Sequence, residues 1–517
     1  MGIWSSKNRT LAVAIAACLA VTSGSLPAQA QDSWTPSFQE FEPSIQNAYD
    51  RGYHNVLIRD EAAQNGSKGS FYLSPGSKST PENLITCFEL GEDLDCGTGK
   101  QGFFSGSAIL PPCQATIENC IEKVWVYQGT SPVEASFVRS LSGQTSVGYP
   151  AKGIPAGSTV SIWSSGTQHS GGSGNYAVIP TLKFGISGNA ISIDRFTVNV
   201  IPVKEVAAQG AIAPEFSICK GPRRVDDVGE CIDNGNFPGN VNCAYTQTNI
   251  CGVAQNFAEN TRVGVQLRLS NKVSGWFHGR LKSPNFAVSR IDSTYNRVTV
   301  DASPAVVSRF FTQTRPDQGH PILQQVLGRS NLGSGGQFTI FESTRPDAMT
   351  VLRTLRDVAK DTAAGLSTVW SVSSMSANQA SYSGSQCLSD TSRLLGIVTT
   401  NATVYSGQAP EFRGGFLSYQ VAGMHYVPGG TELSQGSYDL VLRSDVARCL
   451  YGFSRAPLSA SVSVVNNEGQ RSFATTVVSE KNGWLKMAAY GFTFSEKTIK
   501  VKITKAKVPK AKKKRAR

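Results

Sequence analysis

Short segments in which hydrophobic and polar residues alternate recur along most of the chain. Examples are ISIDRFTVNVIPV (191–203), TRVGVQLRLS (261–270), YNRVTVDAS (295–303), YDLVLRS (438–444) and LSASVSVVN (458–466). In the second of these, one face of a strand would carry Val263, Val265, Leu267 and Leu269, and the other would carry Gln266 and Arg268. This two-residue period predicts β-strands with one buried face.

The turns between these segments predict how the strands are arranged. Asn482-Gly483 lies between two β-rich runs, which indicates a tight hairpin. Glycine, proline and asparagine interrupt the strands at short intervals, and SSGTQHSGGSGN (164–175) reads as a flexible loop between strands. We therefore expect a mainly β protein, built from tandem antiparallel β-sandwich-like modules. The modules would span 31–205, 206–315 and 376–500, with a connector at 316–375.

The connector contains the one segment with helical spacing. In STRPDAMTVLRTLRDVAKDTAAG (343–365), apolar residues recur every three or four positions, at Ala348, Leu352, Leu355 and Val358-Ala359. Thr344 is placed to cap the helix, Pro346 and Asp347 suit its first turn, and Gly365 is placed to end it. The connector is therefore expected to hold one short amphipathic helix.

The first thirty residues have the pattern of a cleaved signal peptide. Lys7 and Arg9 precede the apolar run LAVAIAACLAV, and Ala28-Gln29-Ala30 suits signal cleavage. An alternative is a lipoprotein signal, in which Ile15-Ala16-Ala17-Cys18 would form a lipobox, but apolar residues continue beyond Cys18. No later segment is apolar for long enough to span a bilayer. We therefore expect a secreted or cell-surface protein with no transmembrane helix in the mature chain.

Cysteine usage is typical of an oxidising compartment. After signal cleavage ten cysteines remain. They form two groups of four and a final pair: Cys87, Cys96, Cys113 and Cys120; Cys219, Cys231, Cys243 and Cys251; Cys387 and Cys449. Spacing does not choose the pairing within a group. Because no C-x-x-C pair occurs, disulfides are favoured over a zinc site.

The formal charge of +12 is concentrated at the ends of the chain. Nine lysines and arginines lie between Lys502 and Arg517, two more lie in the signal, and the rest of the chain carries only +1. Residues 501–517 are therefore predicted to be a basic disordered tail. Such a tail would contact anionic wall polymers or polysaccharide through Lys510, Lys512, Lys513, Lys514, Arg515 and Arg517, or would only solubilise the protein. No nucleic-acid partner is expected for an exported protein.

Four segments suggest a resemblance. GWFHGRLKSPN, NRVTVDASP, YDLVLRSDVARCLYGF and EKNGWLKMAAYGFTFS resemble segments of secreted, uncharacterised β-rich proteins of actinobacteria. The resemblance covers about the C-terminal half of the chain. It implies an envelope or extracellular setting and carries over no catalytic residue.

Motifs for catalysis and for metal or cofactor binding are not found. The chain has no G-x-S-x-G elbow, H-E-x-x-H pair, Walker loop or Rossmann fingerprint, and no cofactor is expected. Five histidines occur singly: His54, His169, His278, His320 and His425. A set of oxygen-bearing residues lies close together in RRVDDVGECIDNGN, namely Asp226, Asp227, Glu230, Asp233, Asn234 and Asn236. Its spacing does not match a calcium loop, and a solvated turn is favoured.

One strand carries a candidate ligand face. In GWFHGRLKSPNF (275–286), Trp276, His278 and Arg280 would share one side, opposite Phe277 and Leu281. An indole, an imidazole and a guanidinium could bind a sugar or an anion. Packing of Trp276 and Arg280 against neighbouring strands is the favoured alternative, and it also applies to His425 and Tyr426 in GMHYVPGG.

These observations leave three functional hypotheses. The first is an exported, non-catalytic envelope or extracellular protein that acts in adhesion, scaffolding or wall association. The second is a carbohydrate-binding protein that uses Trp276 or Trp484, and the third is a secreted hydrolase on a β scaffold. The fold class alone does not separate them.

Overall fold

A computed structural model describes most of the chain between residues 54 and 505. The described residues are 54–60, 71–75, 103–114, 119–142, 145, 148, 155–187, 190–207, 243–247, 250–314, 337–375, 385–390, 392–453, 458–466 and 468–505. Both the expected signal peptide at 1–30 and the acidic segment at 226–236 lie outside them. The same holds for the six basic residues expected to contact polymers, and for His320.

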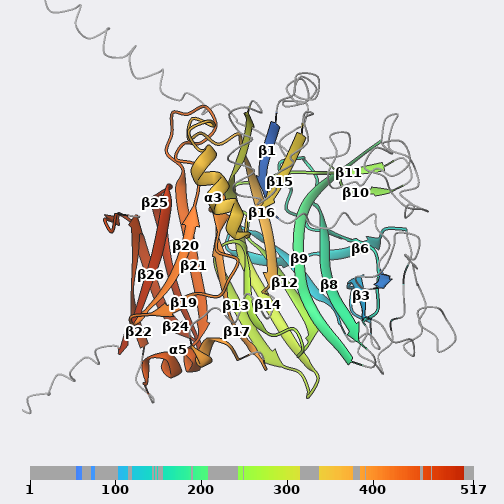
Figure 1. Cartoon of the computed structure of the whole chain (residues 1–517). Coiled ribbons are helices and arrows are strands. Elements are labelled where there is room, and N and C mark those ends of the chain that lie inside the picture. The colour runs from blue at the N-terminus through green and yellow to red at the C-terminus, as the bar shows by residue number, and fades with distance from the viewer. Residues whose placement is uncertain are drawn as a thin grey trace, which may run out of the picture.

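The protein is mainly β, as predicted (Figure 1). The strands are β1 (His54–Arg59), β2 (Phe71–Pro75), β3 (Phe103–Ile109), β4 (Cys120–Gln128), β5 (Ser131–Glu134), β6 (Ser136–Ser140), β7 (Ser161–Ser164), β8 (Asn175–Ser187), β9 (Ala190–Ala207), β10 (Cys243–Gln247), β11 (Ile250–Ala254), β12 (Val263–Ser270), β13 (Gly275–Arg290), β14 (Tyr295–Thr314), β15 (Gln337–Glu342), β16 (Gly365–Ser374), β17 (Leu394–Thr400), β18 (Val404–Tyr405), β19 (Glu411–Arg413), β20 (Phe416–Ala422), β21 (Gln435–Arg443), β22 (Leu458–Asn466), β23 (Arg471–Ser472), β24 (Thr475–Lys481), β25 (Trp484–Thr493) and β26 (Glu496–Lys505). The helices are α3 (Pro346–Leu355), α5 (Ser444–Tyr451) and the 3₁₀ turn η4 (Gln386–Leu388).

Strand pairing joins segments that are distant in sequence. Twenty strands belong to one hydrogen-bonded network, and β18, β19, β20, β22, β23 and β26 form a separate six-stranded sheet. Most pairs are antiparallel, but β1–β15 and β13–β17 are parallel, which the sequence analysis did not predict. Parallel neighbours need long connections, and more than a hundred residues separate the starts of β13 and β17.

Pairs of strands also cross the expected module boundaries. β9 pairs with β16, and β12 pairs with β4. The expected connector contributes β15 and β16 to the sheet network as well as α3. The division into tandem sandwich-like modules stays a prediction.

Strand β13 lies between two hydrophobic cores. Phe277 and Leu281 pack into one core with residues of β4, β12 and β14. Trp276, on the other side of the strand, packs into a second core with residues of β21, β25 and β26. The alternation expected for this strand is therefore present, but both of its faces are covered.

Two local predictions are confirmed. Val263, Val265, Leu267 and Leu269 of β12 are all buried, whereas Gln266 and Arg268 are half-buried. Asn482 and Gly483 have φ angles of 52° and 78° and join β24 to β25, with Lys481 opposite Trp484. Two successive positive φ angles are typical of the tight hairpin turn that the sequence indicates.

The predicted helix is shorter than its periodicity suggested. Ala348, Leu352 and Leu355 are buried as expected, but the N-cap is Arg345 rather than Thr344, and the helix ends at Leu355. Lys360 and Asp361 adopt positive φ angles of 52° and 50°, which a continuing helix does not allow. Gly365 starts β16 instead of ending the helix.

The first five residues of the predicted basic tail lie in a strand. Residues 501–505 belong to β26, and Lys505 pairs with Leu458 of β22. Val501 and Ile503 are buried while Lys500 and Lys502 are exposed. Burial of alternate apolar residues offsets the local charge repulsion that had suggested disorder.

Candidate functional site

Three neighbouring strands of the central sheet present a polar face. Thr197 and Asn199 of β9 lie opposite Ser373 and Ser371 of β16. These two serines in turn lie opposite His278 and Arg280 of β13. Directly opposite residues project from the same face of a sheet. The intervening residues Val198, Val372 and Phe277 point into the core on the other face.

A pocket lies over this polar face. It is a small hollow that is open to solvent on one side. Lys183 of β8 and Gly279 complete the sheet side, and the remaining wall comes from Asp60, Ser343, Thr344 and Tyr405. These four residues follow or belong to β1, β15 and β18, so elements from across the chain build one site. We call it the β16 pocket.

Arg280 is the structural centre of the pocket wall. Its side chain is 1 % exposed. Nε and Nη2 donate to Oδ1 of Asp60 over 2.8 and 2.5 Å, and Nη1 donates to the carbonyl oxygens of Thr400 and Ala402. Nη2 also donates to the Thr403 carbonyl oxygen, and the guanidinium stacks 4.4 Å above the centre of the Tyr405 ring. All five N–H groups are engaged within the protein, so Arg280 orders the wall and has no donor left for a ligand.

Asp60 is held in its charged form. Burial raises the pKa of this carboxyl, but the Arg280 guanidinium and the hydrogen bonds from Arg280 and Ser343 outweigh it, and the net shift is downward. Ser343 Oγ donates to Oδ1 over 2.6 Å. All three of these bonds end on Oδ1, and Oδ2 takes part in none of them. The carboxylate also lines the pocket.

His278 lines the pocket and is one of several buried residues of the described part with an unused hydrogen-bonding atom. Nδ1 lies 2.9 Å from the Tyr405 hydroxyl, whereas Nε2 is buried and has no partner among the described residues. Burial, and then the positive charges of Arg195 and Arg280, lower the pKa of His278 to about 3. The ring is therefore neutral near pH 7. A buried polar atom without a partner is costly, and His278 is one of the residues that line the pocket.

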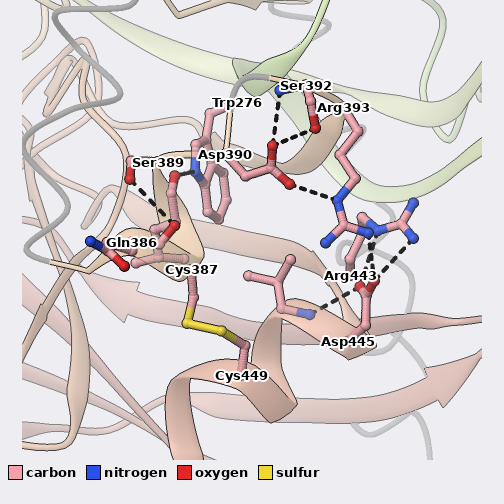
Figure 2. A network of polar contacts seen from close by, with 12 residues as sticks. Trp276, Gln386, Cys387, Ser389, Asp390, Ser392, Arg393, Arg443, Asp445 and Cys449 are labelled. Atoms are coloured by element: carbon pink, nitrogen blue, oxygen red, sulfur yellow. Dashed lines mark hydrogen bonds and ion pairs between the residues drawn. A yellow bond between two sulfur atoms is a disulfide. The ribbon is translucent and has the colours of Figure 1, made fainter.

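The third member of the predicted ligand face, Trp276, lies outside the pocket. Its side chain is fully buried, and Nε1 donates to the Leu388 carbonyl oxygen over 2.9 Å. Figure 2 shows the indole beside η4, which the Cys387–Cys449 disulfide ties to α5. An inaccessible ring cannot stack on a sugar, so the packing interpretation is correct for Trp276. His278 and Arg280 do lie together, with their polar groups at a cavity.

The other aromatic and histidine candidates are also engaged in packing. Trp484 is half-buried and lies edge-on to Phe286, with ring centres 5.0 Å apart. His169 is buried in the 164–175 loop, where Nε2 lies 3.1 Å from the Val203 carbonyl oxygen. Nδ1 of His425 contacts the Phe494 carbonyl oxygen at 2.8 Å, and its ring packs edge-on against Tyr426. His54 starts β1, and its side chain is not among those described.

Four of the candidate cysteines form two disulfides in the described part of the chain. Cys113 pairs with Cys120, and Cys387 pairs with Cys449. Cys243 and Cys251 lie in the paired strands β10 and β11, and their side chains are outside the described part. Cys87, Cys96, Cys219 and Cys231 lie outside it altogether. In the part of the chain that the structure describes, no group of three or more acidic, histidine or cysteine residues could hold a metal ion.

A second buried polar cluster lies around Asp439, which is fully buried. It accepts hydrogen bonds from the Tyr490 hydroxyl and the Ser283 backbone N–H, and Lys486 Nζ lies 3.6 Å from its Oδ1. Lys486 Nζ also donates to Ser283 Oγ over 2.8 Å. Burial raises the pKa of Asp439 and lowers that of Lys486. We call these four residues the Asp439 cluster.

Comparisons of the chain with protein-family models, with curated proteins and with solved structures give no match. Neither helix of the described residues is long and apolar enough to cross a bilayer. The resemblance to secreted actinobacterial proteins thus stays an expectation, and the site is interpreted from its own geometry.

Most of the β16 pocket lay beyond sequence reasoning. Thr197, Asn199, Ser371 and Ser373 alternate with Val198, Val200, Trp370 and Val372, so the sequence contained the signal for a polar strand face. That signal resembles the solvent face of any half-buried strand. Asp60, Ser343 and Tyr405 carry no local signal, because only the tertiary arrangement of β1, β15 and β18 brings them to Arg280.

Proposed function

We propose that the protein is an exported, non-catalytic binding protein of the cell envelope or extracellular space, and that the β16 pocket binds a carbohydrate. The observation that carries this proposal is the chemistry of the pocket wall. Hydroxyl and amide side chains cover its floor, and the neutral imidazole of His278 has a buried nitrogen without a partner among the described residues. Sugars present both donors and acceptors at short spacing, and such a wall can match them.

The charged groups of the wall include an ion pair within the protein. Asp60 pairs with Arg280, and Lys183 is the third charged residue of the lining. The hydroxyl and amide groups of the wall are therefore the basis for proposing a sugar as the ligand. The ring of Tyr405 is stacked under Arg280, so recognition rests on hydrogen bonds rather than on aromatic stacking. Adhesion, scaffolding and wall association are roles that such binding would serve in an exported protein.

The hydrolase hypothesis gains no support from the described residues. None of the three described histidine rings contacts a serine, threonine or cysteine side chain. Lys486 does contact a serine, but it donates the hydrogen bond to Ser283 and faces the buried carboxylate of Asp439. A general base must instead accept the proton of the nucleophile.

Calorimetric titration with a panel of neutral sugars, sugar acids and polyols tests the proposal. Asn199→Leu removes a pocket amide, and Asn296→Leu is the matched control, because Asn296 is also half-buried on a strand but lies outside the pocket. Loss of one or two hydrogen bonds should weaken binding by about 1–2 kcal/mol, or roughly tenfold. If no member of the panel binds, or if both variants bind as wild type does, the pocket is not a carbohydrate site.

A further inference from the structure

The six-stranded sheet has an outer face that differs from the rest of the protein surface. Its inner face packs into the second core through Ile499, Val501 and Ile503 of β26. The alternate residues Lys500 and Lys502 are exposed. Figure 1 places β26 and β22 at the left side of the molecule, at the C-terminal end of the chain. We call the exposed side of this sheet the outer face.

The strand register aligns four cations on the outer face. Arg413 lies opposite Phe416, and the ring of Phe416 lies 5.6 Å from Nζ of Lys502. Lys500 precedes Lys502 by two residues and lies on the same side of β26. Arg471 of β23 lies opposite Val465 of β22, and Val465 lies opposite Thr498 of β26, which is on the same side as Lys500. With strands about 4.8 Å apart and about 3.4 Å per residue, the cations form a diagonal about 24 Å long from β19 to β23.

These four cations have no acidic partners in the part of the chain that the structure describes. None of Arg413, Arg471, Lys500 and Lys502 forms an ion pair with another described residue. Exposed or half-buried arginines elsewhere in the C-terminal half do form such pairs: Arg353 with Glu496, Arg393 with Asp390 and Asp445, and Arg448 with Glu480. An acid does lie on the outer face, since Glu411 is opposite Ser418, but the net charge of the face remains positive.

Hydroxyl groups flank the two central lysines. Ser461 lies opposite Lys502, and Ser463 and Ser418 lie opposite Lys500 on its two sides. A flat face with cations in a line and hydroxyls between them suits a linear chain with repeated negative charges and many hydroxyl groups. The basic residues from Lys507 to Arg517 follow β26 directly in the sequence and would extend the same attraction.

We propose that the outer face binds an acidic polysaccharide along the diagonal Arg413–Lys502–Lys500–Arg471. This site is distinct from the β16 pocket and rests on the proposed export of the protein, not on the pocket. Binding is electrostatic and falls with salt, because exposed charges are screened over about 8–10 Å at physiological ionic strength.

The test measures the affinity of the full-length exported protein for polygalacturonate. Lys500→Gln/Lys502→Gln removes the two central charges, and Lys272→Gln/Lys282→Gln is the matched control, because both of its lysines are exposed and lie outside the outer face. At about 50 mM salt we expect the first variant to bind about tenfold more weakly and the control to stay within about twofold of wild type. Thermal unfolding of both variants checks that the fold is intact.

Two further arms separate the alternatives. The effect of Lys500→Gln/Lys502→Gln should persist when Lys510, Lys512, Lys513 and Lys514 are all replaced by glutamine. Asn199→Leu should leave polygalacturonate binding unchanged, which distinguishes this site from the pocket. Equal binding by the two lysine double variants would overturn the inference, as would binding that depends on the tail lysines alone. Tighter binding to inorganic polyphosphate than to polygalacturonate would overturn the assignment to a polysaccharide.

Discussion

Two buried ion pairs contact the same strand, β13, at positions three residues apart, Arg280 and Ser283. Arg280 pairs with Asp60 at the β16 pocket, and Ser283 joins the pair formed by Lys486 and Asp439. Both carboxylates are held by several donors from different strands. The two ion pairs differ in their surroundings. Arg280 and Asp60 line an open cavity together with His278, whose Nε2 has no partner among the described residues. None of the four members of the Asp439 cluster has a buried side-chain atom without a partner.

This difference separates a binding site from a structural network. A satisfied buried ion pair fixes the register of the strands around it, here at the irregularity of β13 between Lys282 and Asn285. An unpartnered buried atom next to a cavity has a cost that a ligand can remove. Charge and burial are therefore similar in the two places, and the unused hydrogen-bonding capacity distinguishes them.

Loss of Arg280 should have the largest effect on stability. Arg280→Met leaves Asp60 without its guanidinium and three backbone carbonyl oxygens without their donor. We expect a loss of about 3–5 kcal/mol in the free energy of unfolding, since breaking a buried ion pair leaves a charge uncompensated. Urea denaturation measures it. A loss below about 1 kcal/mol would show that Arg280 is not the centre of the wall.

The Asp439 cluster should respond differently to a double replacement. Asp439→Ala should cost about 2–4 kcal/mol in the free energy of unfolding, whereas Asp439→Leu/Lys486→Met should recover most of that loss, because a purely structural pair can be replaced by apolar side chains. Urea denaturation compares the two. Sugar binding should be unchanged in the double variant, and a weakened titration would assign a binding role to the cluster.

The pH dependence of stability should reveal His278. Its pKa is about 3 in the folded protein and about 6.5 in the unfolded chain, so its contribution is complete above pH 6.5 and is lost as the pH falls toward 3. Between pH 6.5 and 5, the free energy of unfolding of wild type should therefore fall by up to about 2 kcal/mol more than that of His278→Gln. Urea titrations at both values measure this, with Asn199→Leu as a control that should keep the wild-type dependence. Parallel pH profiles for His278→Gln and wild type would contradict a buried neutral imidazole.

Two single hydroxyls give the smallest and most closely matched comparison. Ser343 donates to Asp60 in the pocket, and Ser283 accepts from Lys486 in the cluster. Replacement of either serine by alanine should cost about 1 kcal/mol in unfolding free energy, since each loses one hydrogen bond to a charged, partly exposed group. Only Ser343→Ala should also weaken sugar binding. Equal effects on binding would remove the distinction between the two sites.

The sequence predicted the strands well and their partners poorly. The two-residue alternation of β12 and the Asn482-Gly483 turn are local properties, and both were recognised correctly. The parallel pairing of β13 with β17 depends on contacts between segments more than a hundred residues apart, for which alternation gives no information. The helix was placed correctly but was too long, because the periodicity continues to Val358 although that residue is 48 % exposed.

The candidate site was predicted only in part, because alternation is a local property and the site depends on long-range contacts. Alternation correctly put Trp276, His278 and Arg280 on one side of β13, but it does not show what covers that side. The C-terminal core covers Trp276, whereas the wall from β1, β15 and β18 leaves space beside His278. Whether a residue on a strand face packs or binds is decided by the layer above it, and that layer comes from distant parts of the chain.

The most direct test of the account is a sugar-binding titration of two conservative variants, His278→Phe and Tyr490→Phe. Each removes polar atoms from one of the two buried networks while keeping an aromatic ring. We predict that His278→Phe weakens binding of the tightest-binding sugar of the panel about tenfold or more, and that Tyr490→Phe leaves it within about twofold of wild type. Equal affinities for the two variants, or a greater loss in Tyr490→Phe, would contradict the assignment of the β16 pocket as the binding site.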